Sequence, residues 1–245
     1  MKAGLGGLVL GGPLIGCSRD AQEGLAQSPE QTSLPPAALP VETLTDRVRV
    51  ISAAPGNVLV LTTDEGLVLV DSGSAQLAAS LQLSLDGAPV RTLINTHYHP
   101  DQSGGNALFG EAGARIHAHK ITQQWLSADY YVPADDRWVA APPAVARPTE
   151  TFREKAELLL GAENVETGYL LEAHTRGDIY VFLRDSNVLA VGDVVSPQRD
   201  PALDWYAGGW LGGRVDAMDD LLELANQDTL IVPAYGPVMS YADLK

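Results

Sequence analysis

From about residue 45 onward, short apolar runs alternate with polar stretches along the chain. Apolar runs of this length, bounded by turn-forming residues, predict strands. The predicted strands cover residues 58–61, 67–70, 91–95, 114–118, 179–183, 188–191 and 229–232. Turn compositions at 63–66 and 185–187 join neighbouring runs, so each of these two pairs is predicted to form a hairpin.

Helical spacing marks other segments. Leucines recur every fourth residue within 75–85, which places them on one face of a helix. Residues 216–226 have the pattern of an amphipathic helix, and a shorter helix is expected at 107–109. Early hairpins, followed by strands that alternate with helices, indicate an α/β or α+β layered sandwich.

The first 16 residues form a largely apolar run after Lys2. This run is too short to be a permanent membrane span, but it has the size of a signal-peptide core. It ends in Leu14-Ile15-Gly16-Cys17, which resembles the bacterial lipobox, where the chain is cut before a cysteine that is then lipidated. The sequence therefore predicts a lipoprotein signal peptide at 1–16. An ordinary leader or a disordered tail is the alternative.

Residues 17–44 are rich in proline, serine, glutamine and alanine and have no sustained apolar period. Such a composition predicts a flexible linker. One folded domain is then expected over 45–245, a length that suits a single domain with a core. With Cys17 as a lipid anchor, the domain is expected in the bacterial periplasm or at the outer membrane face.

Charge and cysteine content narrow the chemistry. The formal net charge of −15 opposes binding to nucleic-acid phosphates or to anionic lipid, so no nucleic-acid partner is expected. Cys17 is the single cysteine, and it can form neither an internal disulfide nor a thiolate metal site alone. Any metal must therefore be bound by nitrogen and oxygen atoms.

One segment carries a candidate metal site. Residues 96–106 read Thr-His-Tyr-His-Pro-Asp-Gln-Ser-Gly-Gly-Asn and follow a predicted strand. His97 and His99 are two residues apart on a loop, so both imidazoles can converge on one ion, and Asp101 adds an oxygen donor. First-row metal ions favour imidazole and carboxylate ligands.

This segment resembles the signature THxHxDHxGGN of the metallo-β-lactamase superfamily and departs from it at Gln102. Other pieces follow in the family's order over about residues 45–245. They are Asp-Ser-Gly at 71–73, His-Thr-Arg-Gly-Asp at 174–178, Gly-Asp at 192–193, and Pro-Ala-Tyr-Gly-Pro at 233–237. The resemblance implies an α+β fold, the four-layer αβ/βα metallo-β-lactamase sandwich. The family's helix after the last motif is nearly absent, so the chain is expected to be truncated at its C-terminus.

The resemblance also implies two metal positions. His97, His99 and His174 are the implied ligands of a firmly bound zinc ion. The implied ligands of the second ion are Asp101, Gln102, Asp193 and Tyr235. Gln102 and Tyr235 replace histidines; an amide oxygen is a weak zinc ligand, and a phenol with a pKa of about 10 must lose its proton to bind. The second position is therefore expected to be empty or to hold a harder ion such as iron or manganese.

The implied activity is metal-dependent hydrolysis of a small-molecule amide, ester, lactone or thioester. Zinc lowers the pKa of a bound water to about 7, so a hydroxide can attack the carbonyl carbon. Asp101 is expected to relay the proton, and Asp193 to bind a second ion or hold the water. Two alternatives remain: a mononuclear iron oxidoreductase similar to persulfide dioxygenases, and a catalytically inactive, lipid-tethered binding module.

Several other residues have two interpretations. His117 and His119 lie on one face of a predicted strand and could imitate a metal pair, but we interpret both as structural. Asp71 is expected to accept structural hydrogen bonds, and Asp178 to orient the loop of His174. The aromatic residues with an open role, either in a substrate pocket or in packing, are Trp138, Trp205, Tyr206 and Trp210.

Overall fold

The computed structural model describes residues 1, 35–53, 56–197 and 202–245. The chain divides into two units, Met1–Pro35 and Pro36–Lys245. The predicted signal peptide and the lipidation of Cys17 lie outside the described residues. In the part of the chain that is described, no helix is long and apolar enough to span a membrane.

The second unit contains a larger sheet with the strand order β1-β2-β3-β4-β5-β6-β9. Its strands are β1 (Val41–Thr43), β2 (Val48–Ala53), β3 (Gly56–Thr63), β4 (Gly66–Val70), β5 (Val90–Asn95), β6 (Arg115–His119) and β9 (Glu150–Phe152). The first four strands pair in antiparallel fashion, and the pairs from β4 to β9 are parallel. Because β4 and β5 are parallel, their C-terminal ends lie at the same end of the sheet.

A smaller sheet has the order β10-β11-β12-β13-β14. Its strands are β10 (Lys155–Leu160), β11 (Glu163–Tyr169), β12 (Ile179–Leu183), β13 (Val188–Gly192) and β14 (Leu230–Pro233). They form an antiparallel meander, except that β13 and β14 are parallel. A separate hairpin consists of β7 (Tyr130–Val132) and β8 (Arg137–Val139).

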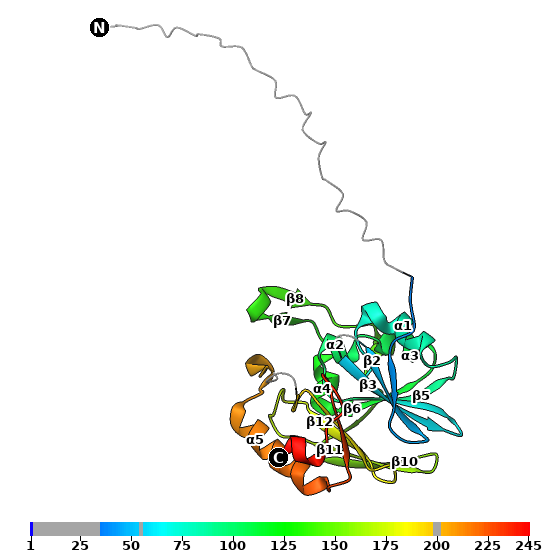
Figure 1. Cartoon of the computed structure of the whole chain (residues 1–245). Helices are drawn as coiled ribbons and strands as arrows, with labels where there is room; N and C mark the ends of the chain where they lie inside the picture. The colour runs from blue at the N-terminus through cyan, green and yellow to red at the C-terminus, as the bar shows by residue number, and fades with distance from the viewer. Residues whose placement is uncertain (2–34, 54–55, 198–201) are drawn as a thin grey trace. The chain divides into compact units, whose positions relative to one another are not determined.

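Helices connect the strands. They are α1 (Ala78–Leu83), α2 (Pro100–Ser103), α3 (Asn106–Glu111), α4 (Lys120–Trp125), α5 (Leu211–Leu224) and α6 (Tyr241–Leu244). Short 3₁₀ turns are η1 (Ala75–Leu77), η2 (Pro133–Asp135), η3 (Ala144–Ala146) and η4 (Trp205–Ala207). Figure 1 shows α5 beside the C-terminal end of the chain.

Four layers follow from the way each strand divides its side chains. In β3, Leu59 and Leu61 pack with residues of the smaller sheet, whereas Val58 and Val60 pack beneath α1 and α3. Successive side chains of a strand point to opposite faces, so a strand covered on both faces reads as an unbroken apolar run. A third cluster places α5 and α6 on the outer face of the smaller sheet. This arrangement confirms the predicted α+β sandwich.

The sequence did not predict seven of the strands, which are β1, β2, β7, β8, β9, β10 and β11, and the bounds of other elements also differ. Residues 36–44, predicted as linker, carry β1, and Leu39 donates its backbone N–H to Ser84 Oγ beyond α1 at 2.7 Å. The helix predicted at 216–226 begins earlier, at Leu211. The folded unit therefore extends further toward the N-terminus than the apolar pattern alone indicated.

Candidate metal centre

The candidate site lies where loops from both sheets meet. His97 and His99 follow β5, His174 lies in the loop between β11 and β12, and Asp193 directly follows β13. Tyr235 comes just after β14, which pairs with β13 so that Gly192 stands beside Pro233. Strand ends of the two sheets thus bring together residues that are far apart in the sequence.

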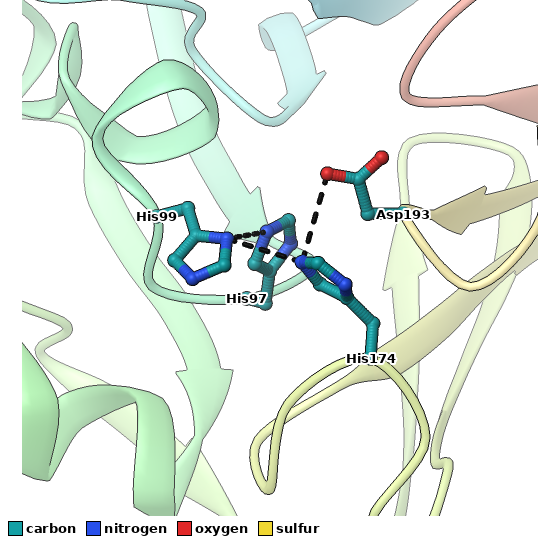
Figure 2. Close-up of side chains that lie close together, drawn as sticks. All are labelled: His97, His99, His174 and Asp193. Atoms are coloured by element: carbon teal, nitrogen blue, oxygen red, sulfur yellow. Dashed lines mark hydrogen bonds and ion pairs between the residues drawn. The ribbon is translucent and has the colours of Figure 1, made fainter. Parts of the chain in front are cut away.

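Four side chains converge on one point (Figure 2). The candidate ligand atoms of His97, His99, His174 and Asp193 all lie within 4.8 Å of one another. His99 Nδ1 is 3.1 Å from His97 Nε2 and also 3.1 Å from His174 Nε2. The Asp193 carboxylate reaches to 3.7 Å from His174 Nε2. Three of these residues are buried, and His99 is half-buried.

The outward nitrogens of two imidazoles donate hydrogen bonds. His99 Nε2 lies 3.0 Å from the Asp204 carboxylate, and His174 Nδ1 contacts the carbonyl oxygen of Ala202. A carboxylate and a carbonyl only accept, so both outward nitrogens carry the proton. In the neutral imidazoles, the lone pairs therefore lie on the inward nitrogens, His99 Nδ1 and His174 Nε2.

His97 is held in the same way through a hydroxyl. Its Nδ1 lies 3.1 Å from Thr96 Oγ1, and this hydroxyl donates to the Asp71 carboxylate at 2.7 Å. Because the hydroxyl proton is used toward Asp71, the oxygen accepts from His97 Nδ1. The inward nitrogen of His97, Nε2, is the one that faces the other two rings.

The three inward lone pairs repel one another unless a cation lies between them. Burial and the neighbouring imidazole of His99 lower the pKa of His174 to about 3 and lower that of His97 well below its usual value. Both rings are therefore neutral. Tetrahedral zinc with bonds of about 2.0–2.1 Å separates its ligand atoms by about 3.3 Å, close to the spacing found here. The donor set fits a zinc-like ion.

His99 differs because it faces carboxylates. Burial lowers its pKa, but the hydrogen bond to Asp204 and the charges of Asp101 and Asp204 outweigh burial, and the net shift is upward. Burial raises the pKa of Asp204, but the hydrogen bonds from His99 and Tyr98 outweigh burial and lower this pKa to about 2. Asp204 is thus an ionised acceptor at neutral pH.

Asp71 takes the structural role expected of it. Its carboxylate accepts from Thr96 N at 2.8 Å and from the Thr96 hydroxyl, and it does not join the four clustered side chains. Burial raises the pKa of Asp71 to about 8, although the two Thr96 hydrogen bonds lower it in part. The residue supports His97 through Thr96.

Asp178 likewise organises a loop. Its carboxylate accepts from Thr175 N at 2.6 Å and from Thr175 Oγ1 at 2.7 Å. Burial raises its pKa to about 7 against these hydrogen bonds. Thr175 follows His174, so Asp178 fixes the turn that carries this imidazole, as the sequence indicated.

The residues implied for a second ion contact one another. The Tyr235 hydroxyl donates to the Asp101 carboxylate. The Gln102 amide packs against Gly56 at the start of β3. A Cβ added to Gly56 would lie 2.6 Å from Gln102 Nε2. Among the described residues, Gln102 Oε1 has no hydrogen-bond partner. Of the two carboxylates in the implied second set, Asp193 belongs to the histidine cluster and Asp101 does not.

His117 and His119 lie outside the cluster. His119 Nε2 is 2.8 Å from the carbonyl oxygen of Arg153, and its ring stacks on Tyr169 at 4.1 Å. His117 Nε2 is 3.3 Å from the Glu150 carboxylate. Both histidines therefore make their contacts away from the four clustered side chains.

Sequence reasoning missed Asp204 as a partner of His99. The two residues are 105 positions apart, and no spacing rule joins them. The hint in the sequence is that Asp204 directly precedes Trp205 and Tyr206, two of the aromatic residues with an open role in a substrate pocket. Trp205, Tyr206, Trp210 and Trp138 are all exposed.

The four-layer fold and the histidine cluster define a metal-binding sandwich protein, and comparisons identify its family. A family model for the metallo-beta-lactamase superfamily matches residues 51–235. The chain belongs to this superfamily.

Characterised relatives are distant. Metallo-beta-lactamase type 2 of Bacillus cereus is 27% identical over 191 residues, which cover 76% of this chain and 69% of the relative. The 2,4-dinitroanisole O-demethylase subunit alpha of a Nocardioides strain is 26% identical over 184 residues, with 71% and 52% covered.

Solved structures share the fold. A metallo-beta-lactamase from Pontibacter korlensis aligns with a TM-score of 0.68 at 21% identity, covering 84% of this chain and 95% of that one. The DIM-1 metallo-beta-lactamase aligns with a TM-score of 0.67 at 18% identity, covering 84% and 94%. Family and cluster together support a metal-dependent hydrolase.

Proposed function

We propose that this chain is a zinc-dependent hydrolase that cleaves a small-molecule amide, ester, lactone or thioester. The observation that supports the proposal most is the set of three inward-facing imidazole nitrogens with the Asp193 carboxylate beside them. Several relatives are named metallo-beta-lactamases, and a lactam is a cyclic amide, so their names agree with this substrate class.

His97, His99 and His174 would hold the ion, and their outward hydrogen bonds would keep them in place. When bound, zinc supplies Lewis-acid chemistry: it acidifies a water molecule and polarises a carbonyl oxygen. Asp193, buried beside His174, would orient the attacking water through its carboxylate.

Asp101 is the proposed proton acceptor. Its carboxylate already accepts a hydrogen bond from Tyr235, which holds it in one orientation. In that position it would take the proton of the attacking water and pass it toward the leaving group.

We further propose that one ion is bound firmly. The Tyr235 hydroxyl and the Asp101 carboxylate satisfy each other without an ion, and the Gln102 amide packs toward Gly56. A neutral amide and a protonated phenol are poor zinc ligands compared with imidazole. The Tyr235–Asp101 pair therefore needs no second cation.

The function is tested by metal analysis combined with a substrate panel. Purified protein is assayed with chromogenic amides, esters, lactones and thioesters, before and after chelation and after zinc is restored. Hydrolysis that is lost on chelation and regained with zinc supports the proposal. Bound iron together with oxygen consumption would favour the oxidoreductase instead. Absence of hydrolysis of every substrate in the panel would favour a binding module.

The proposed location depends on the N-terminal sequence alone. A lipid anchor at Cys17 would tether the domain in the periplasm or at the outer membrane face. Expression in a bacterial host, followed by membrane fractionation, tests this. Cys17→Ser is expected to move the protein from the membrane fraction to the soluble fraction; a wild-type protein that is already soluble and unlipidated would contradict the anchor.

A further inference from the structure

The segment from Ala202 to Asp204 contacts two of the clustered histidines. The Asp204 carboxylate lies 3.0 Å from His99 Nε2, and the Asp204 backbone N–H donates to the carbonyl oxygen of His174 at 2.9 Å. The carbonyl oxygen of Ala202 accepts from His174 Nδ1. One short segment therefore joins the loop after β5 to the loop between β11 and β12.

The Asp204 carboxylate is itself held by two further contacts. The Tyr98 hydroxyl donates to Asp204 Oδ2, the same oxygen that His99 contacts. The Tyr98 ring is buried and stacks on Trp125, with ring centroids 4.7 Å apart and an interplanar angle of 17°. The other oxygen, Oδ1, accepts from Ala207 N at 3.1 Å and so caps η4. Asp204 is thus fixed from both sides.

A fixed acceptor matters because a neutral imidazole can carry its proton on either nitrogen. An acceptor at Nε2 favours the form in which Nε2 carries the proton and Nδ1 carries the lone pair. In His99, Nδ1 is the nitrogen that faces His97 and His174. Without Asp204, the ring would also populate the form whose proton points into the cluster.

We propose that Asp204 is a positioning residue of the candidate metal centre. It holds His99 with the Nδ1 lone pair directed at His97 and His174, and it ties together the two loops that carry these ligands. The effect on metal binding depends on the function proposed above, whereas the effect on the His99 proton can be measured without any metal.

The test separates positioning from helix capping. Asp204→Ser keeps a good N-cap for η4, but its shorter side chain cannot reach His99. Asp204→Asn keeps an oxygen of the right reach, so it is the conservative rescue. Asp219→Ala, on the exposed face of α5, removes an equal charge away from the site and serves as the control.

The first measurement uses metal-free protein. Two-dimensional ¹⁵N NMR distinguishes the two proton positions of an imidazole, and the five histidines of the chain are few enough to assign one by one. At a pH above the raised pKa of His99, this imidazole is expected to carry its proton on Nε2 in the wild type, in Asp204→Asn and in Asp219→Ala. Asp204→Ser is expected to show a mixture of both forms.

The second measurement is zinc affinity by competition with a chromogenic chelator. Loss of an outer partner of a ligand histidine typically weakens metal binding by about 10- to 100-fold, and that loss is expected for Asp204→Ser. Asp204→Asn should recover most of the affinity, and Asp219→Ala should match the wild type.

An Asp204→Ser protein that keeps the wild-type His99 proton position and zinc affinity would overturn the proposal. An equal affinity loss in Asp204→Asn and Asp204→Ser, with no change in the proton position, would also overturn it, because Asp204 would then act through its charge alone. If the proton position changes but the wild type neither binds zinc nor hydrolyses any substrate, the positioning role stands and the proposed function fails.

Discussion

The two halves of the site use similar loops in opposite ways. In the first half, His97, His99 and His174 each give their outward nitrogen to a partner and turn a lone pair toward the same point. In the second half, the Tyr235 hydroxyl donates a hydrogen bond to the Asp101 carboxylate. Three facing lone pairs need a cation, whereas a phenol that donates to a carboxylate needs none.

This difference shows what determines metal occupancy in the fold. Gln102 lies three residues after His99, in helix α2, for which His99 is the N-cap, so one short segment carries both a ligand of the first ion and a residue expected to bind a second ion. The side chains then decide the outcome. Hydrogen bonds on the outward side of the imidazoles direct their lone pairs to one point, which favours a cation. A hydrogen bond between two candidate ligands uses the groups that would bind a cation.

The largest effect is expected where the first half loses a ligand. His174→Ala should lose most bound zinc and most activity, because two imidazoles remain where three converge. The affinity loss should exceed the 10- to 100-fold that is typical of losing an outer partner. Elemental analysis after dialysis measures it.

His117→Ala is the matched control for this loss, because its imidazole contacts Glu150 outside the cluster. It should retain the wild-type zinc content. Unchanged zinc in His174→Ala, or equal loss in both variants, would show that the cluster is not the metal site.

The next largest effect is expected when the second half is given imidazoles. Gln102→His combined with Tyr235→His should raise bound zinc from about one toward two per chain, since both changes supply nitrogen donors and remove the Tyr235–Asp101 hydrogen bond. The measurement is zinc stoichiometry at fixed free zinc, with each single variant as a control.

Two outcomes would contradict this view of the second half. Two tightly held zinc ions in the wild-type protein would mean that Tyr235 or Gln102 already serves as a ligand. A double variant that still binds a single ion would mean that the geometry of the loops, and not the type of ligand, closes the second position.

The sequence predicted the first half well for a physical reason. His97, His99 and Asp193 directly follow strands with long apolar runs, and strands covered on both faces are the easiest to read. Strand β10 was missed because its residues alternate between exposed and half-buried positions, without a strong apolar run. Periodicity therefore identified β3, β4, β5, β6, β12, β13 and β14; besides β10, it missed β1, β2, β7, β8, β9 and β11.

The contacts that decide occupancy were beyond sequence reasoning. Asp204 reaches His99 across 105 residues, and Tyr235 reaches Asp101 across 134. The motif order placed Tyr235 near the site, but the partner of its hydroxyl depends on side-chain rotation. Such pairings follow from packing in three dimensions, which one sequence does not encode as a spacing.

A smaller effect is expected from the support beneath His97. Burial raises the folded-state pKa of Asp71 to about 8 from a usual value of 3.8. A raised folded pKa contributes stability that is complete below the unfolded pKa and is lost as pH rises through the folded pKa. The metal-free protein should therefore lose stability between about pH 4 and pH 8.

Asp71→Asn removes the titrating group while keeping a side chain of the same shape, so it should reduce this pH dependence and leave the part that Asp178, with a pKa raised to about 7, contributes. Thermal unfolding of the metal-free protein at several pH values measures it. Asp219→Ala, whose carboxylate is exposed, is the control and should keep the wild-type slope. An equally steep slope in Asp71→Asn would show that Asp71 is not the group responsible.

The smallest effect is expected at the rim beside the first half. Trp205 follows Asp204, and the segment is anchored to the His174 loop by the Asp204 N–H and by Arg176 N, which donates to Ala207 O at 2.9 Å. The indole of Trp205 is 65% exposed, so a rigid turn presents an apolar face next to the candidate metal centre. A substrate with an aryl group would stack on this face.

Stacking on an aromatic face contributes about 1 kcal/mol, which corresponds to roughly a fivefold change in KM. Trp205→Ala should therefore raise KM by about this factor for aryl-substituted substrates and leave KM for small aliphatic ones unchanged. Zinc content should stay at the wild-type level, because in the described part of the chain the indole makes no hydrogen bond or ring contact with the clustered side chains. Trp138→Ala, on β8, is the matched control for loss of an exposed indole. If Trp205→Ala instead lowers zinc content, then Trp205 supports metal binding in the first half of the site and is not a substrate-binding residue alone.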